Sequence, residues 1–227
     1  MTSIPATQTS IDVSDGVRVS ALLLEPADAR CLLVFAHGAG AGMHHATIET
    51  FARSVTAFRI ATLRFQFPYT EAGRRRPDPP LVLQRSVRAA VAHARAMQPE
   101  LPLLAGGRSM GGRMASGADA VDALDVAGFV FHAFPLHPLG QPGTERADHL
   151  SQVEKPMLFL NGTRDRLADP ELLVGVCDRL GSRATLHLIE GGDHSLQVLK
   201  RSGRRKDDVD REVAEAVSGW CREVLGL

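Results

Sequence analysis

The sequence has few cysteines, no excess of either charge and no long apolar segment. The three cysteines among its 227 residues, Cys31, Cys177 and Cys221, are widely separated and form no C-x-x-C pair, which argues against a disulfide framework or a zinc site. Basic and acidic residues balance at 26 each, so no overall field attracts nucleic acid or an anionic membrane. No apolar run approaches the roughly 20 residues that span a bilayer, and the polar segment 1–14 lacks a signal-peptide pattern. We therefore expect a cytoplasmic protein with neither nucleic-acid nor membrane partners.

Apolar runs alternate with helical patterns along the chain, and no linker-like stretch divides it. The runs expected to be strands are Val17–Leu24, Cys31–Ala36, Ile60–Phe67, Leu101–Ala105, Val126–Ala133, Pro156–Leu160 and Ala184–Ile189. This alternation predicts one α/β domain over residues 1–227, with a mainly parallel sheet of seven to eight strands and helices on both faces. In such a sheet the functional site lies at the carboxyl ends of the strands.

The candidate nucleophile is Ser109, at the centre of the pentapeptide GRSMG at residues 107–111. The pentapeptide follows the apolar run 101–105 and opens a segment of small residues, which predicts a strand, a sharp turn and the start of a helix. A serine on such a turn adopts a strained backbone conformation, and strand and helix approach closely around it. The flanking glycines satisfy both demands.

A serine hydroxyl is a weak nucleophile at neutral pH and needs a base. The candidate base is His194, which follows the expected strand 184–189 and a glycine turn, and so is presented at the carboxyl edge of the sheet. The alternative is a capping or solvated histidine ahead of a helix expected at 195–199. His187 lies within the strand itself and is expected to be packed or exposed rather than catalytic.

Two acids follow the expected strand at 156–160 and compete to orient this base. Asp169 precedes Pro170 at the start of a helical pattern, which is the arrangement of an N-cap followed by proline in the first helical position. Asp165 lies in the turn directly after the strand, where it has no helix to cap. We therefore expect Asp165 to orient His194 and to stabilise its charged form.

Donors for a developing oxyanion come from backbone N–H groups in tight loops of small residues. The buried run 31–36 ends in His37-Gly-Ala-Gly-Ala-Gly, so we expect the N–H groups of Ala39 and Met110 to form the oxyanion hole, with Gly40 as the next candidate. This loop lacks the spacing of a dinucleotide fingerprint and the lysine of a P-loop. His37 has no acidic or cysteine partner that would complete a ligand set, so we expect no metal and no other cofactor.

With the elbow around Ser109, the His-Gly loop and the chain order Ser109, Asp165, His194, the chain resembles the α/β-hydrolase superfamily over nearly its whole length. Within it, the chain is similar to the small, lidless, dienelactone-hydrolase-like group, and most to predicted hydrolases of the testis-expressed-protein type. The segments that carry this finer match are HGAGAGMHH (37–45), RFQFPYTEAGRRRPDPP (64–80), GGRSMGGRMAS (106–116) and FPLHPLG (134–140).

The resemblance implies a sheet of eight strands or slightly fewer and the hydrolysis of an ester or related acyl bond. The elbow carries Ser109 where true dienelactone hydrolases have a cysteine, so their substrate does not carry over. Some relatives of the finer group serve in larger complexes, which leaves a non-catalytic or weakly catalytic interaction module as the rival function. A thioesterase, a peptidase or a haloperoxidase-like enzyme would share the same machinery.

Residues that contact substrate are harder to predict than the catalytic ones. The segment 136–155, between the expected strands at 126–133 and 156–160, is too short for a large cap domain, so the cleft should be open. His37, Phe67, Tyr69 and His137 are candidates for its lining, although packing is an equally good explanation for such residues. The basic runs 74–76 and 200–206 are expected to be solvated loops, with binding of an anionic substrate or partner as the alternative.

Overall fold

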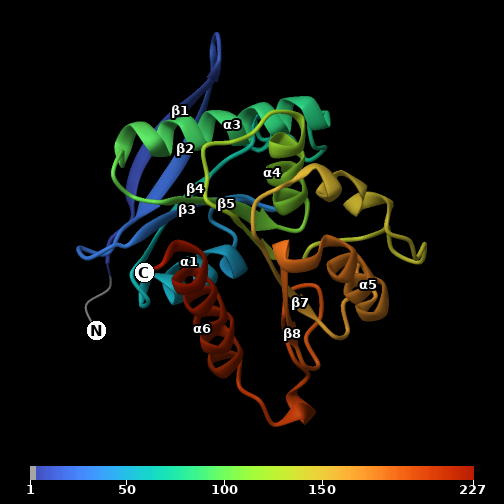
Figure 1. The fold of residues 1–227 in the computed structure, drawn as a ribbon. Coiled ribbons are helices and arrows are strands. Elements are labelled where there is room, and N and C mark those ends of the chain that lie inside the picture. Colours follow the sequence, from blue (N-terminus) through green and yellow to red (C-terminus); the bar gives the residue numbers. More distant parts are fainter. Residues whose placement is uncertain (1–3) are drawn as a thin grey trace.

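The computed structural model describes residues 4–227, whose core is an eight-stranded sheet (Figure 1). Its strands are β1 (Thr7–Ser14), β2 (Val17–Leu24), β3 (Cys31–Ala36), β4 (Ile60–Phe65), β5 (Leu103–Arg108), β6 (Phe129–His132), β7 (Met157–Gly162) and β8 (Ala184–Ile189). Their order across the sheet is β1-β2-β4-β3-β5-β6-β7-β8. Both pairings of β2 are antiparallel, and every pairing from β4 to β8 is parallel. The carboxyl ends of β3 to β8 therefore lie at one edge.

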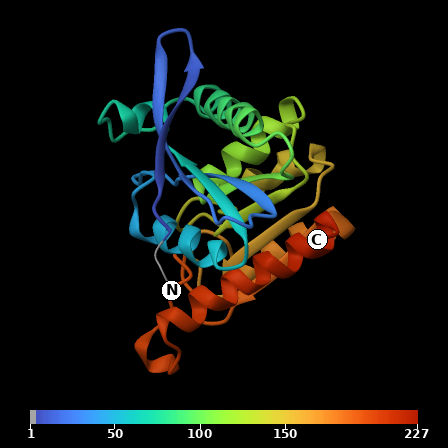
Figure 2. The same cartoon turned by 90° about the vertical axis from the view of Figure 1, so that its left-hand side faces the viewer.

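Helices cover both faces of this sheet. They are α1 (Ala46–Thr56), α2 (Pro68–Glu71), α3 (Pro80–Met97), α4 (Met110–Val121), α5 (Pro170–Leu180) and α6 (Lys206–Leu225), with 3-10 turns η1 (Glu145–Gln152), η2 (Gly181–Arg183) and η3 (Lys200–Ser202). Helices α3, α4 and α5 pack in the core of one face, and α1 and α6 in the core of the other. Figure 2 shows the two helical layers on opposite sides of the strands, with the hairpin of β1 and β2 extending away from them.

The central strands are buried on both faces, which explains why they are continuous apolar runs in the sequence. In β3, Leu32 and Val34 belong to the core under α3 and α4, whereas Leu33 and Phe35 belong to the core under α1 and α6. Successive side chains of a strand point to opposite faces, so one uninterrupted apolar run serves both cores.

The structure corrects several expected boundaries. Strand β1 was not expected, because only Ile11 and Val13 of its eight residues are buried. Strand β5 begins at Leu103 and continues to Arg108, so it includes the glycines that the sequence suggested belong to the turn. No helix forms at 195–199; a turn at 194–195 and a bend at Leu196 lead into an irregular stretch before η3.

The connection between β6 and β7 contains only η1, so no cap domain is inserted there. Within residues 4–227, no helix has the length and apolar character needed to cross a membrane.

Candidate active site

Ser109 stands on a sharp turn between β5 and α4. Its φ of 51° and ψ of −116° lie in a region that non-glycine residues rarely occupy, and strain of this kind concentrates at functional sites. The turn is possible because glycines lie on either side of it: a Cβ added to Gly107 or to Gly111 would lie 2.4 Å from the carbonyl oxygen of Ala36. The sequence therefore specifies an elbow that presents a serine at the carboxyl edge of the sheet.

A chain of hydrogen bonds joins Ser109 to residues that follow two later strands. His194 Nε2 lies 2.8 Å from Ser109 Oγ, and His194 Nδ1 lies 2.8 Å from Asp165 Oδ2. The Asp165 side chain is fully buried, whereas 22% of the His194 side chain is exposed. The carboxylate is thus held away from water, whereas the imidazole stays partly accessible to solvent.

Contacts with nearby residues fix the Asp165 carboxylate in this position. Its Oδ1 accepts a hydrogen bond from the N–H of Leu167 at 2.8 Å, and its Oδ2 lies 3.5 Å from Asn161 Nδ2. Asp169 points elsewhere and caps α5, accepting from the N–H groups of Glu171 and Leu172 at 3.0 and 3.3 Å. The structure therefore places Asp165 beside the histidine and Asp169 at the start of α5.

The glycine-rich loop after β3 packs directly on the elbow. A Cβ added to Gly38 would lie 3.5 Å from Ser109 Cβ, which places the loop beside the hydroxyl. Met110 begins α4, so its N–H is among the first-turn donors that have no partner within the helix. The N–H groups of Ala39, Gly40 and Met110 thus belong to two segments that meet at Ser109.

Side chains from the end of β4 hold this loop in place. Gln66 Oε1 accepts from the N–H of Met43 at 3.1 Å, and buried Arg64 donates to the carbonyl oxygen of Met43 at 3.1 Å. His37 Nε2 accepts from the N–H of Phe67 at 3.1 Å, so its proton is on Nδ1, which donates to the carbonyl oxygen of Gly38 at 2.9 Å. Burial lowers the pKa of His37 to about 4, which keeps the ring neutral and this pattern intact.

The expectation that His37, Phe67, Tyr69 and His137 line an open cleft is not supported by their burial. Their exposed fractions are 0%, 0%, 1% and 3%. Strand β4 ends at Phe65 and α2 begins at Pro68, so the rings of Phe67 and Tyr69 turn into the core and pack around His37. Phe67 and Tyr69 thus support the glycine-rich loop through His37. His137 lies apart from them and, although almost fully buried, borders a small pocket beside Asp165.

Arg108 is a site residue that the sequence analysis did not identify. Its Nη2 donates to Ser195 Oγ at 2.9 Å. Burial lowers the pKa of this guanidinium, and the nearby carboxylates of Asp165 and Asp193 oppose that shift. The position of Arg108 within GRSMG was visible in the sequence, but its pairing with the residue after His194 depends on the meeting of two distant loops.

A mostly parallel sheet with a strained serine elbow at its carboxyl edge is characteristic of an α/β-hydrolase fold. The chain belongs to the alpha/beta hydrolase domain family, whose model matches residues 29–222.

Solved structures of similar shape cover nearly the whole chain. The α/β serine hydrolase XC6422 from Xanthomonas campestris, described as having no lid, matches with a TM-score of 0.73 at 21% identity over 95% of this chain and 94% of its own. A dienelactone hydrolase from Anabaena variabilis matches with a TM-score of 0.73 at 20% identity, over 96% of this chain and 97% of its own. Est1E from Butyrivibrio proteoclasticus, solved with ferulic acid, matches with a TM-score of 0.77 at 18% identity, over 96% of this chain and 100% of its own. At these identities the likeness establishes the fold.

Proposed function

We propose that this protein is a serine hydrolase that cleaves a carboxylic ester or a related acyl bond through an acyl-enzyme intermediate. The observation that carries the proposal is the continuous contact from Ser109 Oγ through both ring nitrogens of His194 to the buried Asp165 carboxylate. A strained elbow and a buried acid are costly to maintain, and both are features that concentrate at catalytic sites.

In the proposed mechanism, Ser109 Oγ attacks the acyl carbon while His194 Nε2 accepts the hydroxyl proton. The tetrahedral intermediate collapses, the bond to the alcohol breaks, and the alcohol leaves with the proton from His194. Water then attacks the acyl group on Ser109 and passes a proton to His194. The carboxylic acid departs as Ser109 regains its hydroxyl proton.

Asp165 and the backbone stabilise the charges that develop along this path. Asp165 holds the Nδ1 proton of His194, so that Nε2 faces Ser109 as an acceptor, and it offsets the positive charge of the imidazolium. The N–H groups of Met110 and Ala39, or Gly40 in place of Ala39, donate to the oxyanion. One such donor contributes roughly 10²- to 10³-fold to kcat in comparable sites.

Hydrolysis of short p-nitrophenyl esters tests this function. We expect turnover by the wild type, an initial burst of p-nitrophenol equal to the enzyme concentration where deacylation is slower than acylation, and loss of turnover in Ser109→Ala. Ser151→Ala, which changes an exposed serine in η1, is the matched control and should retain full activity. Equal turnover by Ser109→Ala and the wild type would exclude the proposed nucleophile.

A further inference from the structure

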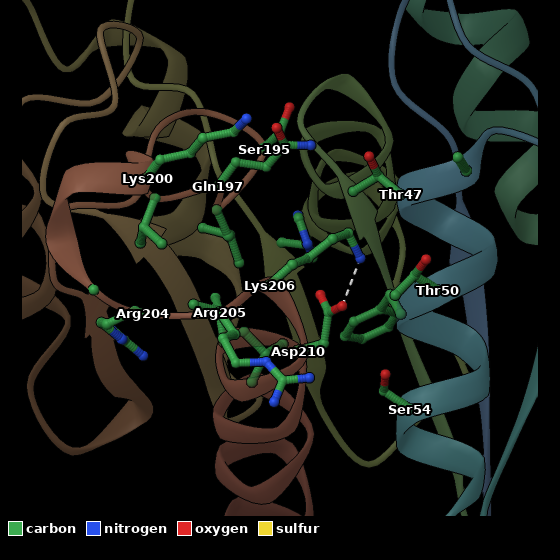
Figure 3. Close-up of a pocket in the computed structure, with 18 residues that line it drawn as sticks. Thr47, Thr50, Ser54, Ser195, Gln197, Lys200, Arg204, Arg205, Lys206 and Asp210 are labelled. Carbon is green, nitrogen blue, oxygen red and sulfur yellow. Dashed lines mark hydrogen bonds and ion pairs between the residues drawn. The ribbon is translucent and has the colours of Figure 1, made fainter.

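A cavity of about 610 Å³ lies between α1 and α6 and is bordered by the segment 195–198, which follows His194 (Figure 3). Its size is in the range of small-molecule sites. It exists because the face of α1 that meets α6 has short side chains, Thr47, Thr50 and Ser54, spaced by three and four residues. Figure 3 shows these hydroxyl side chains on one side and the start of α6 on the other.

The inner walls of this cavity are apolar. They are lined by four buried side chains: Phe51 of α1, Leu196 of the segment after His194, and Val209 and Val213 of α6. His132, at the end of β6, is 4% exposed and also lines it, and its Nδ1 has no hydrogen-bond partner within the described chain. Burial lowers the pKa of His132 to about 3, so the ring is neutral and the deep part of the cavity carries no charge.

The outer rim is cationic. Its basic side chains are Lys200, Arg204, Arg205 and Lys206, and the one acidic residue among the lining residues is Asp210. Asp210 pairs with Lys206 at 2.5 Å, and Arg204 turns to Glu212. Lys200 has no ion-pair partner among residues 4–227. The Arg205 pair with Asp207 is long, at 3.6 Å, and both of its side chains are more than three-quarters exposed.

The cavity also contacts the loop that carries the candidate base. Ser195, Leu196 and Gln197 follow His194 directly and line the cavity. Leu196 has a φ of 59°, a strained conformation for leucine, and this places its side chain in the apolar wall. His132 borders the nucleophile, because the N–H of Ser109 donates to its carbonyl oxygen at 3.0 Å.

We infer that this cavity is a second ligand site that binds a small amphipathic organic anion, with its apolar body between α1 and α6 and its carboxylate at Lys200. The neutral, apolar depth and the cationic rim set this orientation. The segment 200–206 thereby has a role beyond that of a solvated loop. The inference goes beyond the proposed hydrolase activity and does not depend on it.

Calorimetric titration with octanoate tests the inference, with 1-octanol as the probe of equal chain length and no charge. Both titrations use the full chain with Ser109→Ala, so that no catalytic step contributes. We expect saturable binding of octanoate and at least about tenfold weaker binding of octanol, as expected when a charge contact is lost. Absence of saturable octanoate binding, or equal affinity for the two probes, overturns the inference.

Three further substitutions in the Ser109→Ala background locate the bound ligand. Thr50→Trp places an indole in the cavity from the half-buried face of α1 and should abolish binding, whereas Lys200→Glu should weaken it about fivefold. Arg201→Glu makes the same charge change on the exposed neighbour that does not line the cavity, and should leave the affinity within about twofold. Binding that Thr50→Trp and Lys200→Glu leave unchanged lies elsewhere, for instance beside Ser109, and contradicts the inference.

Discussion

Arg108 and Ser195 join the two loops on which the proposed chemistry depends, since the guanidinium donates to the hydroxyl at 2.9 Å. Arg108 directly precedes Ser109, and Ser195 directly follows His194. The base loop is also braced from within, because Asp193 Oδ1 accepts from the N–H groups of Ser195 and Gln197 at 2.7 and 3.1 Å. The distance between nucleophile and base is therefore set by contacts beside both residues.

Ser195→Ala should lower kcat for p-nitrophenyl acetate about fivefold to tenfold, because a hydrogen bond from a charged donor is lost and His194 is held less firmly. KM should change little. Ser195→Thr keeps the hydroxyl and should retain most of the activity. If Ser195→Ala lowers the thermal midpoint but leaves kcat unchanged, the contact serves stability alone.

Asp165 and Asp169 should respond to substitution in opposite ways. Asp165→Asn should lower kcat by about 10⁴-fold, because the amide no longer holds the Nδ1 proton of His194, with little effect on unfolding. Asp169→Ala removes the cap of α5 and should lower the free energy of unfolding by about 1 kcal/mol with kcat retained. Urea unfolding and ester turnover on both variants make the comparison, and equal losses of activity would show that the acid is wrongly assigned.

Buried neutral histidines should make stability fall in mild acid. Burial lowers the pKa of His37 and His149 to about 4, and that of His132 to about 3, whereas unfolded histidine titrates at about 6.5. Between these values the unfolded chain binds more protons than the folded one, so the free energy of unfolding decreases as the pH falls from about 6.5 towards 4.

Substitution of His149 tests the cause of this acid effect. His149→Gln keeps a hydrogen-bond partner for the Ser116 hydroxyl, which lies 2.8 Å from His149 Nε2, and should reduce the slope of stability against pH in this range. Stability at pH 8 should change much less. His44→Gln, at an exposed histidine, is the control and should keep the wild-type slope. Denaturant midpoints measured across the range give the result, and an unchanged slope in His149→Gln would remove that residue from the explanation.

Two glycines should differ sharply when each is replaced by alanine. Gly111 has no room, since its Cβ would lie 2.4 Å from the carbonyl oxygen of Ala36, so Gly111→Ala should destabilise the fold and disturb the elbow. Gly219 lies within α6 with nothing within 4 Å of an added Cβ, so Gly219→Ala should stabilise the protein by up to about 1 kcal/mol. Thermal unfolding compares them, and a neutral Gly111→Ala would contradict the close approach of α4 and β3.

The sequence is informative about this fold where a residue's neighbours along the chain determine its role. Asp169 with Pro170 is a local cap signal, and the glycines around Ser109 are a local elbow signal, so both were predicted. Gly106 shows the limit of such signals. It resembles a turn residue, yet it lies inside β5, where glycine is required because the backbone of β6 comes too close for a side chain. Strand β1 was missed for a different reason: one of its faces is exposed, so its sequence contains no continuous apolar run.

Contacts between distant segments could not be predicted from one sequence. Some hydrogen bonds depend on which segments the order of the strands brings together. Examples are those of Arg64 and Gln66 with the backbone of Met43, and that of Arg108 with Ser195. Phe67 and Tyr69 resembled cleft residues because aromatic side chains in a loop after a strand suit either a pocket or a core. Their burial follows from the place where β4 stops.

The central claim is that Ser109 is an activated nucleophile, and covalent labelling with a fluorophosphonate probe tests it most directly. Intact mass and peptide mapping on the wild type should show one adduct, on Ser109, and His194→Ala should label far more slowly while remaining folded. No adduct on folded wild type, or a rate that does not depend on His194, would contradict the account and favour a role in binding.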